Sequence, residues 1–146
     1  MRAFFLAIQL FLQEAKTPEQ QTIGLMGVEH LSDSEGMLFT FPSSEMRRFW
    51  SFGCLISLDV GFLDDDLVLR EIVPLPAHPF WKKQRPIHTQ ADLRKALMET
   101  THSYFFASSK AAYRYVIELP SGWFERHKVD VGAKLHKTDT FSYFSP

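Results

Sequence analysis

Two carboxylates stand inside apolar runs of this sequence, where an ionised side chain needs a partner, water or a ligand. Asp59 lies in the segment 49–70, which reads FWSFGCLISLDVGFLDDDLVLR, and Glu118 lies in YVIELPSGW. Two carboxyl groups in one cleft form the arrangement that acid/base hydrolysis of a glycosidic bond requires. Asp59 and Glu118 are therefore the first candidates for chemistry.

The surroundings of Asp59 favour a structural role. The period-two alternation of a strand places Asp59 on a face of small residues, between Ser57 and Gly61. If the following turn centres on the DDD run, Arg70 falls diagonally across from Asp59, within ion-pairing reach. We expect Asp59 to accept hydrogen bonds from backbone N–H groups of a neighbouring loop and from Arg70. Ligand binding and catalysis stay open as alternatives.

Glu118 is open to the same two interpretations. We expect it to pair with Arg114 on the same strand face, or with another basic residue, in preference to facing Asp59. The leading functional hypothesis is a non-catalytic binding or accessory module with a small polar pocket near Asp59, walled by Trp50 and Trp123. The candidate ligand-binding residues are Asp59, Glu118, Trp50, Ser57, Arg70 and Trp123. The alternative is a hydrolase-like enzyme that uses the two carboxylates as acid and base on a saccharide.

No motif for a metal, cofactor or nucleophile stands out. The six histidines have no metal-ligand spacing, and Cys54 has no second thiol. The aspartate run 64–66 lacks the ligand ladder of a calcium loop and is better explained as a hairpin tip. Phosphate-binding loops and nucleophile elbows do not occur. The sequence predicts no metal and no cofactor.

The charge balance argues against nucleic acid or an anionic membrane as an obligate partner. Sixteen basic residues face 17 acidic ones among 146 residues, of which 45% are hydrophobic. One basic patch mixed with aromatic residues occurs at 80–85, FWKKQR, and is best explained as a solvated surface. A small polar ligand or a protein partner remains possible, and the oligomeric state is open.

The first residues, MRAFFLAIQLFLQEAKT, resemble an export signal only superficially. Gln9 interrupts the apolar stretch, and no small-residue cleavage site follows before Thr17. The stretch is rich in strand-forming residues and too short to cross a bilayer. It predicts a strand, and cytoplasmic location is slightly favoured over export.

The remaining pattern predicts one domain over residues 1–146 with mostly strands. Thr17, Pro18 and Gln20 form a helix-start signature, and that helix should end near Gly27. Strands are expected at 4–15, 37–41, 47–52, 56–63, 67–73, 112–120 and from about 134. A proline-rich insertion at about 75–112 should carry one helix, at 89–102.

Short strands without a βαβ rhythm indicate a mainly β fold, an antiparallel sandwich or barrel. The segments GLMGVEHLSDSEGMLFTF, FWSFGCLISLDVGFLD and YVIELPSGW, in this order, resemble the bacterial and archaeal domain-of-unknown-function family 192. The resemblance covers about residues 8–136, without the insertion. It implies a jelly-roll-like fold with one short helix near the start, and no established activity.

The resemblance holds at most positions of these segments and fails at the polar ones. Family members usually carry arginine where this chain has Val28, and asparagine and threonine where it has Gly53 and Cys54. This chain therefore keeps only the aspartate of such a polar site. The matching positions are Gly24, Leu25, Met26, Gly36, Met37, Phe39, Phe49, Trp50, Leu58, Asp59, Phe62, Asp64, Glu118, Leu119 and Gly122.

Overall fold

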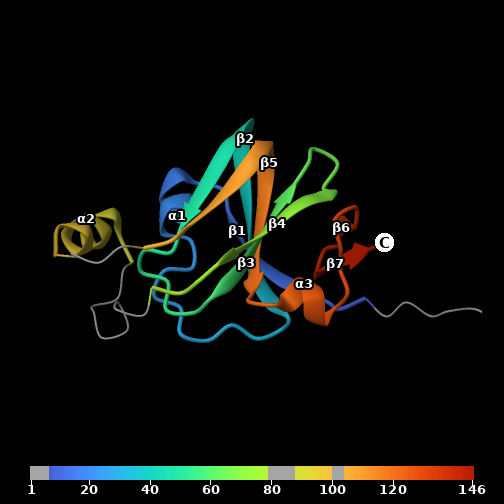
Figure 1. Cartoon of the computed structure of the whole chain (residues 1–146), viewed down its shortest axis with the longest axis horizontal. Helices are drawn as coiled ribbons and strands as arrows, with labels where there is room; N and C mark the ends of the chain where they lie inside the picture. The colour runs from blue at the N-terminus through green and yellow to red at the C-terminus, as the bar shows by residue number, and fades with distance from the viewer. Residues whose placement is uncertain (1–6, 79–87, 100–103) are drawn as a thin grey trace, which may run out of the picture.

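The structure is a computed structural model, and it describes residues 7–78, 88–99 and 104–146. Strands dominate these residues, and the helices are short (Figure 1). The elements are, in chain order, β1 (Phe11–Ala15), α1 (Pro18–Ile23), β2 (Glu35–Trp50), β3 (Leu58–Leu63), β4 (Leu69–Leu75), α2 (Gln90–Glu99), β5 (Phe106–Pro120), α3 (Trp123–Arg126), β6 (Lys134–Lys137) and β7 (Ser142–Ser145).

The fold consists of one five-stranded sheet and one two-stranded sheet. The order in the large sheet is β1-β2-β5-β3-β4, and β6 pairs with β7. The predicted mainly β class is confirmed, although the large sheet is mixed, because β1 runs parallel to β2. A parallel pair needs a long crossover, which α1 and the segment after it supply here. The jelly-roll likeness stays a prediction.

The start of α1 forms as its sequence predicts. The Thr17 Oγ1 accepts a hydrogen bond from the Gln20 N–H (3.2 Å), and the Gln20 Oε1 accepts one from the Thr17 N–H (3.1 Å). The helix ends at Ile23, earlier than predicted, because Gly24 takes a positive φ of 51° that ends the helical geometry. This early end leaves the segment after α1 free to line a cavity.

The sequence predicts two strands, 37–41 and 47–52, joined by a turn at FPSSE, and this prediction is wrong. The two segments belong to the single long strand β2, which pairs with β5 over most of its length with two register shifts (Figure 1). The pairing shifts between Thr40 and Glu45, where Pro42 has no N–H to donate. The proline therefore marks a bulge within a continuous strand.

This bulge bends the β2–β5 ribbon back on itself. The rings of Phe39 and Phe49, ten positions apart on one strand, lie with their centroids only 5.0 Å apart. A straight strand would separate them by roughly 33 Å. The large sheet is therefore strongly curved, and its concave side faces α1.

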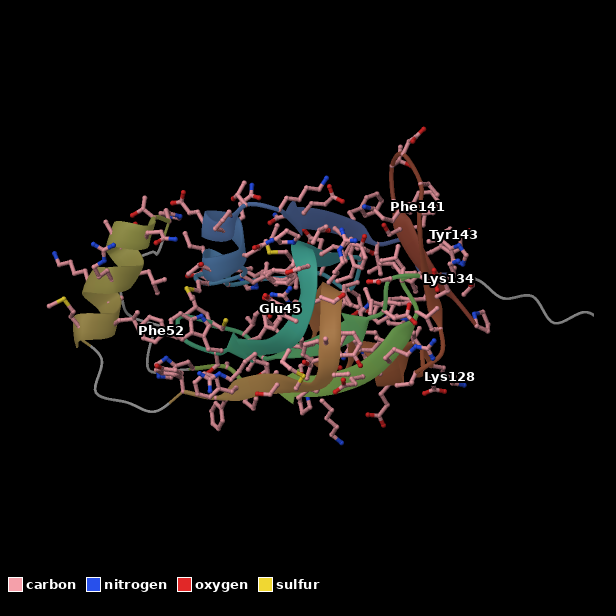
Figure 2. The ribbon with its side chains drawn as sticks, turned by 90° about the horizontal axis from the view of Figure 1, so that it is seen from above. Glu45, Phe52, Lys128, Lys134, Phe141 and Tyr143 are labelled. Atoms are coloured by element: carbon pink, nitrogen blue, oxygen red, sulfur yellow. The ribbon has the colours of Figure 1, made fainter. Side chains whose placement is uncertain are left out.

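Each face of the large sheet carries its own apolar core. On one face the sheet packs against α3, β6 and β7 through Leu38, Ile117, Leu119, Trp123, Phe124 and Phe144. On the other face it packs under α1 and the segment after it, through Leu25, Met37, Phe39, Val60, Phe62 and Val116. Figure 2 shows Phe52 at the α2 end of the molecule and Lys134 and Tyr143 at the opposite end.

The insertion is shorter than predicted, because β5 already begins at Phe106. The predicted helix is present as α2, whose Leu93 and Ala96 are buried against Met26 and Phe52. The basic patch FWKKQR at 80–85 lies outside the described residues.

At the other end of the chain, β1 begins only at Phe11, and residues 4–6 of the strand predicted at 4–15 lie outside the described residues. No helix in the described ranges has the length and apolar character that crossing a membrane requires.

Candidate functional site

Asp59 and Glu118 lie on opposite faces of the large sheet. In the pairing of β3 with β5, Asp59 stands opposite Leu119, and Glu118 stands opposite Val60. Side chains of successive strand residues point to opposite faces, so Glu118 shares the face of Val60 and Asp59 that of Leu119. The two carboxyl groups therefore cannot meet in one cleft. This geometry contradicts the hydrolase alternative in which they act together as acid and base.

Asp59 binds the loop that precedes α3. Its Oδ2 accepts a hydrogen bond from the Gly122 N–H at 3.1 Å, as expected for a carboxylate that receives backbone donors. Its pKa is raised because burial outweighs this hydrogen bond. The predicted contact with Arg70 is wrong: Asp59 pairs with Pro74, which leaves Arg70 to form an ion pair with Asp64 at 2.8 Å.

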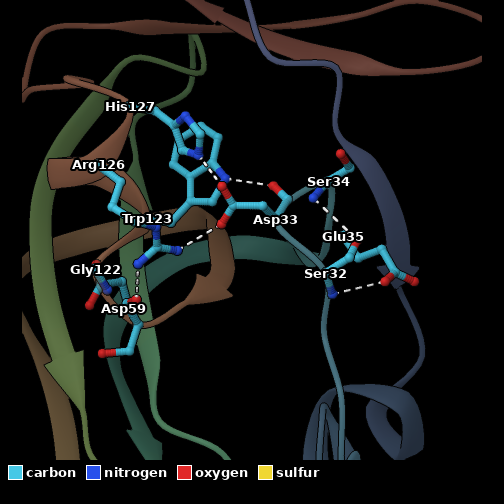
Figure 3. Close-up of polar contacts among 10 residues, drawn as sticks. Ser32, Asp33, Ser34, Glu35, Asp59, Gly122, Trp123, Arg126 and His127 are labelled. Carbon is cyan, nitrogen blue, oxygen red and sulfur yellow. Dashed lines mark hydrogen bonds and ion pairs between the residues drawn. The ribbon is translucent and has the colours of Figure 1, made fainter.

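A polar cluster that the sequence did not suggest lies beside Asp59 (Figure 3). Asp33 binds Arg126 through Oδ1 at 2.7 Å and contacts His127 through Oδ2. The Trp123 indole N–H donates to the Asp33 carbonyl at 2.8 Å. These contacts attach the segment between α1 and β2 to α3. Both Asp33 oxygens already have partners, so the cluster has a structural explanation.

The other predicted site residues are dispersed. Trp123 is 1% exposed and belongs to the core beneath α3 rather than to a pocket wall. Ser57 is exposed, and its Oγ accepts a hydrogen bond from the Ala77 N–H at 2.9 Å. Trp50 is half-buried at the end of β2, against Phe52. Of the six candidates, Trp50 and Glu118 line one cavity together.

Glu118 is a buried titratable group with a strongly raised pKa. Its residue is only 4% exposed, and no hydrogen bond or ion pair to it occurs within the described part of the chain. The predicted partner Arg114 instead donates to the Phe41 carbonyl at 3.3 Å, which corrects that expectation. Burial without a counter-charge raises the pKa of Glu118 from 4.5 to about 8. The carboxyl group is therefore mostly protonated at neutral pH.

Glu118 lines a cavity of about 550 Å³ between α1, the segment after it and the concave side of the β2–β5 ribbon. We call this cavity the Glu118 pocket. Its volume is in the range of small-molecule sites. Its apolar lining consists of Ile23, Leu25, Met26, Phe39, Phe41, Met46, Phe49, Trp50 and Phe106. Its other lining residues are Pro18, Gln21, Thr22, Gly24, Arg47, Arg48, Cys54 and Glu118.

The local sequence explains why this space stays open. The bend of β2 sets Phe39 against Phe49 and forms a curved aromatic wall. Gly24 forms part of the opposite side, where an added Cβ would lie 3.3 Å from the Phe39 ring and 3.6 Å from the Glu118 Oε1. A side chain at position 24 would therefore stand between the cavity and the carboxyl group.

The two arginines of the Glu118 pocket differ in whether their N–H donors already have protein partners. The Arg47 guanidinium donates to the Tyr113 carbonyl at 2.9 Å and contacts the Ser43 carbonyl and Glu45. The Arg48 guanidinium lies 4.2 Å over the Phe106 ring, and within the described residues this ring is its one assigned partner. Arg48 thus keeps its N–H donors free.

Two observations narrow the chemistry of this pocket. Burial, and secondarily the nearby Glu118, raises the pKa of the Cys54 thiol, so the reactive thiolate is disfavoured. No group of three histidine, cysteine, aspartate or glutamate side chains able to hold a metal ion occurs in the ranges that the structure describes. The pocket therefore offers apolar contact, one neutral carboxyl group and a guanidinium.

Sequence reasoning found Trp50 and Glu118 but missed the aromatic wall, Gly24 and Arg48. The signal for these features was Pro42, which stands in a stretch typical of a turn. A bulge at that proline would have predicted that the two halves of β2 face each other.

The comparisons with known proteins agree with the order of the sequence segments. Residues 7–137 match the model of the family DUF192, which is described as Uncharacterized ACR. This chain belongs to the DUF192 family. The match confirms the resemblance seen in the sequence. The comparison with curated proteins finds no match.

Two solved structures share the fold of this DUF192 member. One is a protein from Sinorhizobium meliloti 1021, described provisionally as a transcription regulator, with 24% identity, a TM-score of 0.65, and coverage of 93% of this chain and 81% of that one. The other is a protein of unknown function from Novosphingobium aromaticivorans DSM 12444, with 23% identity, a TM-score of 0.67, and coverage of 88% and 75%. At these identities the likeness concerns the fold alone.

Proposed function

We propose that this protein is a non-catalytic binding module whose ligand is a small organic molecule held in the Glu118 pocket. This proposal keeps the hypothesis of a binding module from the sequence but moves the site. The pocket lies on the face of Glu118, not beside Asp59.

The observation that carries the proposal is a buried carboxyl group without a partner that lines a cavity. Removing a carboxyl group from bulk water costs free energy unless it gains a hydrogen bond, and no group in the described residues gives Glu118 one. A ligand oxygen or nitrogen that reaches Glu118 would supply the missing hydrogen bond. The aromatic wall would bury the rest of the ligand.

The chemistry of the lining favours binding over catalysis. The titratable side chains of the pocket are Glu118, Cys54 and the two arginines Arg47 and Arg48. A nucleophile needs an adjacent base, and a general base must itself be deprotonated. The thiol of Cys54 and the carboxyl of Glu118 both stay protonated in their surroundings, so neither activates the other.

Methionine methyl groups provide a direct test of the site. Met26 and Met46 line the Glu118 pocket, whereas Met98 is 84% exposed on α2 and serves as an internal control. A library of small aromatic and aliphatic fragments is titrated into protein labelled with ¹³C at its methionine methyls. We expect binding fragments to shift the Met26 and Met46 resonances together and to leave Met98 unmoved.

Two variants make this experiment decisive. Glu118→Leu removes the carboxyl group and should weaken fragments that carry a hydrogen-bonding group. Asp59→Asn, on the opposite face, should leave them unaffected. The proposal is wrong if no fragment shifts Met26 and Met46, or if bound fragments shift only methyl groups outside the pocket.

A further inference from the structure

We propose that the Glu118 pocket selects a monocarboxylic acid with an aromatic or branched hydrocarbon body, whose carboxylate binds Arg48. This inference rests on the proposed function and adds the class of ligand. The geometry behind it consists of one available guanidinium, an aromatic wall and a neutral inner end.

Arg48 is the anion-binding group because its neighbour is already occupied. The three contacts of Arg47 with Ser43, Glu45 and Tyr113 fix that side chain to β2 and β5. Arg48 has its Cζ 4.2 Å from the centroid of the Phe106 ring, and no hydrogen bond or ion pair occupies its guanidinium among the described residues. A guanidinium has its N–H donors in the plane of the group, where they match the two oxygens of a carboxylate.

The apolar walls of the pocket favour a particular hydrocarbon group in the ligand. Phe39, Phe41 and Phe49 contact one another edge-on or stacked, and the Arg47 guanidinium lies 3.7 Å over the Phe41 ring. Met26 and Trp50 add to the apolar lining. An aromatic ring or a branched chain gains most from such a surface, because the gain grows with the apolar area removed from water.

The inner end of the pocket, at Glu118, disfavours a cationic ligand. A charged Glu118 would attract an amine, but burial keeps this carboxyl group neutral near pH 7. The charged side chains that line the pocket are then Arg47 and Arg48, and both repel a cation. A protonated carboxyl group can still donate a hydrogen bond to a neutral oxygen at the inner end of a ligand.

Three probes that share one body and differ in the head group test this selectivity. They are 3-phenylpropionate, 3-phenylpropanol and 3-phenylpropylamine, and their affinities are measured by calorimetry with the methionine methyl shifts as a record of the site. We expect the carboxylate to bind about tenfold more tightly than the alcohol, as a charge-assisted pair predicts. The amine should bind most weakly.

Two arginine variants give the matched comparison. Arg48→Gln should remove the preference for the carboxylate and leave the affinity of the alcohol within about twofold. Arg70→Gln, which changes an exposed arginine outside the pocket, should preserve the preference. Thermal melts of both variants confirm that they are folded.

The outcomes separate this inference from the proposed function. If the alcohol matches the carboxylate while both shift Met26 and Met46, the pocket binds ligands but the inference is wrong. It is equally wrong if the amine binds most tightly, or if the preference survives in Arg48→Gln. If none of the three probes shifts these methyl groups, the ligand class is refuted, and the fragment library then decides on the pocket itself.

Discussion

Replacing Glu118 with glutamine should change how the free energy of unfolding depends on pH. Burial raises the pKa of this carboxyl group from 4.5 to about 8 in the folded protein. Between these values the folded chain holds a proton that the unfolded chain has released, so wild-type stability falls as the pH rises. Each pH unit costs about 1.4 kcal/mol, or on the order of 4 kcal/mol between pH 5 and pH 8.

Glutamine does not titrate, so the free energy of unfolding of the variant should not fall with pH in this way. Urea unfolding followed by tryptophan fluorescence from pH 5 to pH 8 gives the difference in stability between variant and wild type. We expect the two to be similar at pH 5 and the variant to gain steadily toward pH 8. Glu19→Gln, on the exposed side of α1, is the control and should leave the slope unchanged. If the stability difference between variant and wild type stays constant from pH 5 to pH 8, Glu118 does not have the raised pKa on which this prediction depends.

Three further changes test other parts of the structure. Asp59→Ala should lower the free energy of unfolding by about 1 to 3 kcal/mol, because the Gly122 N–H loses its acceptor, and Asp59→Asn should cost less. Gly24→Ala should destabilise the fold by about 1 kcal/mol at its φ of 51° and weaken fragment binding, since its methyl would narrow the approach to Glu118. Asp33→Asn should destabilise at pH 7, and the difference should disappear as the pH falls through the lowered pKa of Asp33: hydrogen bonding from Arg126 lowers this pKa, and the wild-type protein loses that stability as the carboxylate is protonated. Urea unfolding measures all three, and the methionine shifts report the binding of Gly24→Ala.

Local chemistry made part of this fold predictable. The two partners of the capping box, Thr17 and Gln20, lie within four residues of each other, so this short stretch of sequence is enough to predict it. The same holds for the hairpin tip, where the Asp64 Oδ1 accepts hydrogen bonds from the Asp66 and Val68 N–H groups. Such signals need no knowledge of distant segments.

The candidate site was less predictable, because it depends on partners far away in the chain. Pro42 is equally suited to a turn and to a bulge, and only the pairing of β2 with β5 decides between them. Strand alternation placed Glu118 on one face but could not show what covers that face. The contact of Arg114 with the Phe41 carbonyl likewise follows from the bend. The pocket is a product of tertiary structure.

The role of Glu118 in the pocket is tested by titration of its side-chain carboxyl carbon by ¹³C NMR, without ligand and with saturating 3-phenylpropionate. A midpoint near pH 8 is expected in the free protein, because the carboxyl group is buried without a partner. A higher midpoint is expected with the probe, because its apolar body excludes water from the carboxyl group. A midpoint near 4.5, or one that the bound probe leaves unchanged, would contradict the claim that Glu118 forms the inner end of a binding pocket.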